Sequence, residues 1–176
     1  FKGCTSLTTA PELPATTMTS EMMDNSSSSD IGCYESMFYG CTALTTAPAL
    51  PATTLTPSCY KNMFYGCTSL TTAPELPATT LAGRYRYYYN NTYISGCYQS
   101  MFEGCTALTT VPDLPAATLA DYCCYNMFKG CTSLTTAPAL PSIKLASYCY
   151  QYMFNGCTAL TTAPALPSTI LASYCY

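Results

Sequence analysis

Cysteine is the residue type in this chain with the widest chemical scope. Thirteen cysteines occur in 176 residues, and ten of them form pairs eight positions apart. These pairs are Cys33 and Cys41, Cys59 and Cys67, Cys97 and Cys105, Cys123 and Cys131, and Cys149 and Cys157. The chain has no histidine, and structural zinc sites use closely spaced cysteine pairs, so this spacing favours disulfides over metal binding. We expect disulfides, no metal, no cofactor and an oxidising, extracellular compartment.

Three states of these cysteines fit the spacing. Links between cysteines eight positions apart are favoured, because so short a path suits the Cα separation of a disulfide. They would leave Cys4 and Cys175 without partners. A second scheme uses twelve cysteines, as 4–33, 41–59, 67–97, 105–123, 131–149 and 157–175. In the third state, all are buried thiols that pack as small apolar side chains.

The second group of residues with functional potential lies in the segment AGRYRYYYNNTYISG at 82–96. Tyrosine with arginine and asparagine is typical of recognition loops, because it combines flat amphipathic area with adaptable hydrogen bonds. The predicted partner-binding residues are Arg84, Tyr85, Arg86, Tyr87, Tyr88, Tyr89, Asn90 and Tyr93. The alternative is a structural role, in which these side chains seal an edge or pair with the acidic segment 19–32.

Composition argues against several function classes. The net charge of −3 disfavours a nucleic-acid partner, and no apolar run approaches the ~20 residues that span a bilayer. The lack of histidine removes the commonest general base. No nucleophile–base pair, phosphate-binding loop or carboxylate cluster is evident, so we expect no enzyme.

These residues are positioned by an internal repeat. Phenylalanines occur at Phe1, Phe38, Phe64, Phe102, Phe128 and Phe154, with successive separations of 37, 26, 38, 26 and 26. The basic period is therefore 26, and the two longer separations reflect insertions at 19–32 and 82–96, which fall at the same point of the unit. A unit this short buries its apolar face only against neighbouring copies, so the repeat predicts one solenoid of six coils over 1–176.

Each coil is expected to contain three kinds of segment. CTALTTA predicts a short strand that repeats into a parallel β-sheet on one side. The prolines that follow cannot donate to a sheet and predict an extended segment. CYKNMF at 59–64 has helical character and predicts a short helical or 3-10 turn that ends near Gly66.

The motif MFxGCTxLTTAPxLPxTxL resembles the BspA-like leucine-rich repeat of bacterial surface proteins, and all six units match it. The resemblance implies a leucine-rich-repeat solenoid, export to the cell surface, and adhesion or recognition of a protein or glycan. The chain begins without methionine or signal peptide, and neither terminus has a polar capping repeat, so we expect a piece of a longer array.

Other functions fit the same pattern. Open-ended coils could stack end to end, as a structural subunit of an extracellular filament, a surface layer or a phage particle. Ranked threonines also form hydroxyl arrays of the kind that binds ice, although the insertions would interrupt a flat face. We expect a recognition module first and a structural subunit second.

Overall fold

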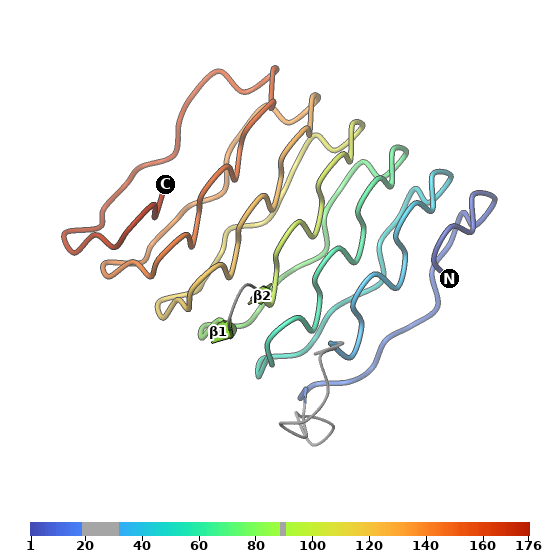
Figure 1. The fold of residues 1–176 in the computed structure, drawn as a ribbon. Helices are drawn as coiled ribbons and strands as arrows, with labels where there is room; N and C mark the ends of the chain where they lie inside the picture. Colours follow the sequence, from blue (N-terminus) through green and yellow to red (C-terminus); the bar gives the residue numbers. More distant parts are fainter. Residues whose placement is uncertain (19–31, 89–90) are drawn as a thin grey trace.

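Successive coils of the chain stack side by side along one axis, with the N-terminal and C-terminal coils at opposite ends (Figure 1). The computed structural model describes residues 1–18, 32–88 and 91–176, and of residues 84–88 and 91–95 it describes the backbone alone. Phe38 and Phe64, which are one repeat period apart in sequence, stack with ring centroids 5.6 Å apart and planes 7° apart. The sequence period is therefore the period of the coils.

Each coil contains a run of consecutive β-turns, which residues 56–67 illustrate. Every second amide donates to the carbonyl three residues earlier, and in alternate turns the third residue has positive φ. These residues are Ser58, Asn62 and Gly66, with φ of 61°, 54° and 68°. Type II turns require positive φ at that place, and glycine and asparagine adopt it at low cost. A left-handed residue at every fourth position prevents the short helix that the sequence predicted.

The turn runs of neighbouring coils are joined by hydrogen bonds along the stack. Phe64 N donates to Met101 O at 2.9 Å, and Gly66 N donates to Glu103 O at 2.8 Å. Equivalent bonds join the other coils at alternate residues, while the intervening amides close the turns. Every second backbone amide of this segment thus stabilises the contact between coils, and the others stabilise the coil itself.

The interior consists of columns of like residues. Members of these columns are almost fully buried, including Phe38, Phe64, Phe102, Phe128, Leu44, Leu70, Leu108, Met63, Met101, Tyr60 and Tyr98. Phenylalanine rings stack along the whole described column, at centroid separations from 5.5 to 5.9 Å. Each apolar residue is therefore buried mainly by its counterparts in the adjacent coils.

The threonine segments pair through single residues. Thr9, Thr46, Thr72 and Thr110 are joined by isolated parallel bridges, in place of the continuous sheet that the sequence predicted. Prolines follow within five residues and cannot donate to a ladder, which keeps this pairing short. Among the described residues the strands are β1 (Gly83–Tyr88) and β2 (Asn91–Gly96), and no helix occurs.

Candidate functional site

The second insertion is a β-hairpin that leaves the coil stack at one edge (Figure 1). Strands β1 and β2 pair antiparallel, from Gly83 opposite Gly96 at the base to Tyr88 opposite Asn91 at the far end. The sequence interpretation treated this segment as a loop. The signal for a hairpin was present, because the segment is rich in tyrosine, threonine and isoleucine and has a glycine at each end.

The hairpin register arranges most of the predicted binding residues. Arg84 lies opposite Ser95, Arg86 opposite Tyr93 and Tyr87 opposite Thr92. Directly opposed residues of an antiparallel pair belong to the same face, so Arg86 and Tyr93 are placed on one face of the hairpin backbone. Tyr89 and Asn90 of the prediction lie outside the described residues, as does 19–31 of the first insertion.

Two glycines at the base of the hairpin allow its backbone to contact the backbone of the next coil closely. A Cβ on Gly96 would clash with Tyr122 O, and a Cβ on Gly83 would clash with Asp121 O. Both clashes are with backbone atoms, which cannot rotate away as a side chain can. The base of the hairpin is therefore held in close contact with the backbone of the coil stack.

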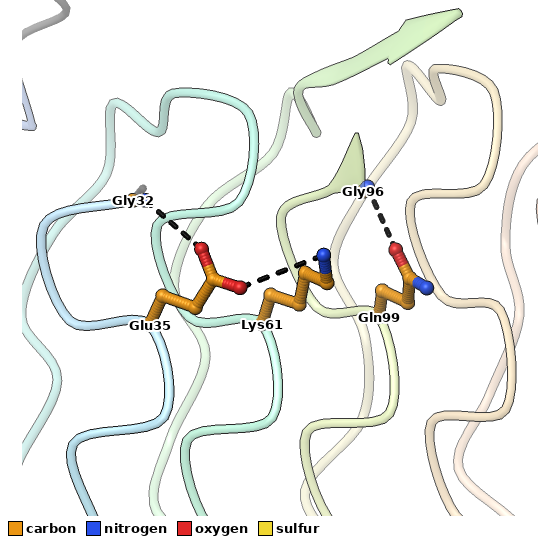
Figure 2. A network of polar contacts seen from close by, with 5 residues as sticks. All are labelled: Gly32, Glu35, Lys61, Gly96 and Gln99. Atoms are coloured by element: carbon orange, nitrogen blue, oxygen red, sulfur yellow. Dashed lines mark hydrogen bonds and ion pairs between the residues drawn. The ribbon is translucent and has the colours of Figure 1, made fainter. Parts of the chain in front are cut away.

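Each insertion ends at a glycine, and a side chain three residues after that glycine accepts a hydrogen bond from its amide (Figure 2). Gln99 Oε1 accepts from Gly96 N at 3.4 Å, and Glu35 Oε2 accepts from Gly32 N at 3.2 Å. Glu35 also pairs with Lys61 across the coil boundary at 3.5 Å. The two insertions thus return to the stack through the same local structure, a glycine whose amide is satisfied by a side chain.

A row of tyrosines continues the edge beyond the hairpin. Tyr122, Tyr148 and Tyr174 hold the position that Gly96 holds one coil earlier, and their rings stack at 4.5 and 5.0 Å. Exposure rises along the row, from 5% for Tyr122 to 65% for Tyr174. Sequence reasoning missed these residues, although the change from serine or glycine to tyrosine at this position was visible.

The predicted disulfide residues lie in two columns that run along the stack. Cys41, Cys67, Cys105, Cys131 and Cys157 each donate a thiol hydrogen bond to the phenylalanine carbonyl of the preceding coil, at 3.1 Å. In the other column, Cys149 Sγ donates to Cys175 O at 3.5 Å. The link between Cys59 and Cys67 is not formed in this structure. Disulfides across the coil stay a prediction.

Burial suppresses the reactivity of these thiols. It raises the pKa of Cys59 and Cys67 from 9.0 to about 12, and it raises the pKa of Cys97 well above 9.0. The thiolate is the form that attacks electrophiles and binds metals, so a thiol that stays protonated does neither. Within the described residues, no group of three or more cysteine or acidic side chains could hold a metal ion. These contacts suit a packing role.

Comparisons with known proteins give no match. No protein-family model fits the chain, and neither the curated proteins nor the solved structures include one that is similar to it. In the described ranges, no helix has the length and apolar character that crossing a membrane requires.

Proposed function

We propose that this chain is a non-catalytic recognition module at a cell surface, which binds a protein or glycan partner through the β1–β2 hairpin. The observation that carries the proposal is the contrast between monotonous buried columns and one hairpin of divergent composition. Positions 84–93 hold five tyrosines and two arginines, which are the residue types enriched in binding hot spots.

The hairpin base supports this role. A binding surface loses less entropy on association when it is ordered beforehand. Antiparallel pairing from Gly83 to Asn91 and the close contacts of Gly83 and Gly96 both restrict the hairpin at its base.

The class of fold belongs to the proposal. We assign the coil stack to the leucine-rich-repeat solenoids, and the resemblance to the BspA-like repeat supports an extracellular location. The stacked phenylalanine column and the fixed repeat period are the features that support a solenoid. A solenoid keeps its repeated residues for packing, so function concentrates in the insertions.

Replacement of Tyr85, Tyr87 and Tyr88 by alanine tests the proposal. Binding to glycan arrays and to immobilised extracellular-matrix proteins should fall at least tenfold, because rigid aromatic contact area is lost. The melting temperature should change little, because these residues belong to the hairpin rather than to the core columns.

A matched control is the double replacement of Tyr39 and Tyr65 by alanine. These rings stack at 4.6 Å one residue after the phenylalanine column, outside the inserted hairpin. The control should bind as the parent does. Unchanged binding by the hairpin variant, or an equal loss in the control, would remove the hairpin from the binding surface.

A structural role, in which copies of the coil stack join end to end, is the second candidate. Leu166 and Leu171 are 53% and 64% exposed, whereas Leu140 and Leu145, their counterparts one coil earlier, are each 4% exposed. A second copy that stacked on this coil would cover them. Sedimentation across a concentration series distinguishes the candidates, because end-to-end stacking predicts a mass that rises with concentration.

A further inference from the structure

A polar groove lies at the foot of the hairpin, between two neighbouring coils. Gly83 lines it at one end, with residues 117–121 along one wall and Lys144, Leu145 and Ala146 along the other. Its volume of about 530 Å³ is within the usual range of small-ligand sites. None of the predicted binding residues lines this groove, but Arg84 is the residue that follows Gly83.

In the described part of the chain, two backbone hydrogen bonds are absent between the walls of the groove, as they also are between the coils of Leu55 and Thr80. In the adjacent pair of coils, Leu81 N donates to Thr118 O at 2.9 Å and Ala117 N donates to Thr79 O at 3.0 Å. The equivalent bonds, from Leu119 N to Lys144 O and from Ile143 N to Ala117 O, are not formed among the described residues. Two amides and two carbonyls are therefore left without these partners along the groove.

Hydrogen bonds at both ends hold the walls in place. Ser142 Oγ donates to Ala116 O at 2.5 Å on one side of the open stretch. On the other side, Ser147 N donates to Asp121 Oδ1 at 2.8 Å, and Tyr122 N donates to Ser147 O at 3.1 Å. The groove is thus a bounded opening within the coil contact, and it presents both donors and acceptors.

The cation in the groove is a departure from the repeat. Lys144 occupies the column that holds Thr17, Thr54, Thr80 and Thr118 in the preceding coils. It is exposed, and no carboxylate pairs with it among the described residues. Asp121 is also in the groove, but its Oδ1 already accepts from Ser147 N.

Half of the chain's cations belong to this region. Of six cationic residues, Lys61 and Lys129 form ion pairs with Glu35 and Glu103, at 3.5 and 3.1 Å. Lys2 lies 4.9 Å from the ring centroid of Tyr39. The remaining three are Lys144 in the groove and Arg84 and Arg86 on β1, within three residues of Gly83. Asp121 is the carboxylate among the residues that line the groove, so the three cations of this region outnumber it.

From the open groove, its cation and the adjoining hairpin, we infer that the hairpin-foot groove binds an acidic oligosaccharide. Sugar hydroxyls would pair with the open amides and carbonyls, and a carboxylate of the sugar would pair with Lys144. The arginines of β1 add positive charge on the approach. The inference rests on the proposed recognition function and specifies its ligand class.

A saccharide suits the groove better than an extended peptide. The open stretch has only two missing bonds, and serine and aspartate links close it at both ends, so a strand could not continue through it. A polyol needs donors and acceptors over a short distance, which the two backbone strips provide. A single lysine and two arginines select for negative charge on such a ligand.

Calorimetric titration with three matched probes tests the inference. The probes are a glucuronic-acid oligomer, its methyl ester and the neutral glucose oligomer of equal length. The charged oligomer should bind at least tenfold more tightly than the other two, and its affinity should fall as salt is raised. Lys144→Ala should weaken this binding about tenfold, and Lys144→Arg should retain most of it.

Thr80→Ala is the matched control, because Thr80 holds the same column position two coils before Lys144. Unchanged binding by Lys144→Ala, equal binding of the ester, or no binding of the charged oligomer would overturn the assignment. A sulfated glucose oligomer that bound as tightly as the uronate would support an acidic oligosaccharide and remove the specific role of the carboxylate. Partner loss in the hairpin tyrosine variant, with Lys144→Ala unaffected, would leave the proposed function standing and remove this inference alone.

Discussion

The buried columns and the edge that carries the hairpin differ in how uniform their residues are from coil to coil. In the columns, phenylalanine, cysteine and leucine recur in each unit, and each residue packs on its counterpart in the next coil. At the edge, the position just before the second cysteine column holds Gly96 at the hairpin and Tyr122 and Tyr148 in the coils that follow. The columns thus tolerate little change, whereas the edge accepts either an inserted hairpin or a large aromatic side chain.

Backbone conformation explains the freedom of the edge. Tyr122 and Tyr148 adopt positive φ of 59° and 58° in uninterrupted coils, a conformation that costs a residue with a side chain roughly 1–2 kcal/mol. Gly96 is not among the residues of positive φ, and the tight contact with Tyr122 O is what requires glycine there. The backbone at this position therefore adopts one of two conformations. It is a left-handed turn residue in uninterrupted coils, and it is a glycine at the end of the hairpin where the insertion occurs.

The largest predicted effect is the loss of folding stability when the buried cysteine thiols of the columns ionise. Burial raises the pKa of Cys59, Cys67, Cys131 and Cys149 from 9.0 to about 12, so the folded chain holds these protons more tightly than the unfolded chain. Their stabilising contribution is complete below about pH 9 and is lost as pH rises toward 12. Each thiol should lower the free energy of unfolding by about 1.4 kcal/mol per pH unit in that window.

Denaturant unfolding in reductant-free buffer at pH 8 to 11 measures this loss. A count of reactive thiols in denaturant accompanies it, and should give thirteen if all the cysteines are thiols. A count of three, with stability independent of pH, would instead mean that the five predicted disulfides form. The stability of the columns would then come from covalent links rather than from packing.

The next effect comes from the hairpin base. Gly96→Ala should lower the free energy of unfolding by about 3 kcal/mol, because its Cβ would clash with the backbone of Tyr122. Gly3→Ala is the control, since Gly3 has φ of +75° but nothing within 4 Å of an added Cβ. It should cost only about 1 kcal/mol. Equal losses in the two variants would show that the hairpin base does not press against the coil.

A smaller difference in stability is expected between glutamine replacements in a coil with an insertion and in a coil without one. Gln99→Ala removes the acceptor for Gly96 N and should cost about 1 kcal/mol. Gln151 holds the same column position in a coil without an insertion, so Gln151→Ala should cost less than about 0.5 kcal/mol. Chemical denaturation of both variants measures the difference. If the two losses are the same, the cap does not belong to the insertion.

The sequence predicted the coil period and the buried columns because identical residues at a fixed spacing have few ways to bury themselves. Phe64 and Cys67 were placed in columns from spacing alone, and both are fully buried. The turn run at 56–67 was not predicted. Its residues have ordinary helical propensity, and the repeat pattern does not report the left-handed conformation of Ser58 and Asn62.

The candidate site was predicted in part for similar reasons. The divergent segment 82–96 was found by its composition, but the hairpin register and the tyrosine row depend on contacts between coils. The groove beside Lys144 depends on which backbone hydrogen bonds form between neighbouring coils, and the sequence pattern does not report them.

Deletion of residues 84–95 tests the central claim most directly, namely that the hairpin serves binding and the columns serve folding. It joins Gly83 to Gly96 and returns the spacing from Phe64 to Phe102 to that of an uninterrupted unit. Thermal unfolding of the deletion variant should match the parent within about 0.5 kcal/mol, while binding to the parent's partner is lost. A variant that fails to fold, or one that folds and still binds, would contradict the account.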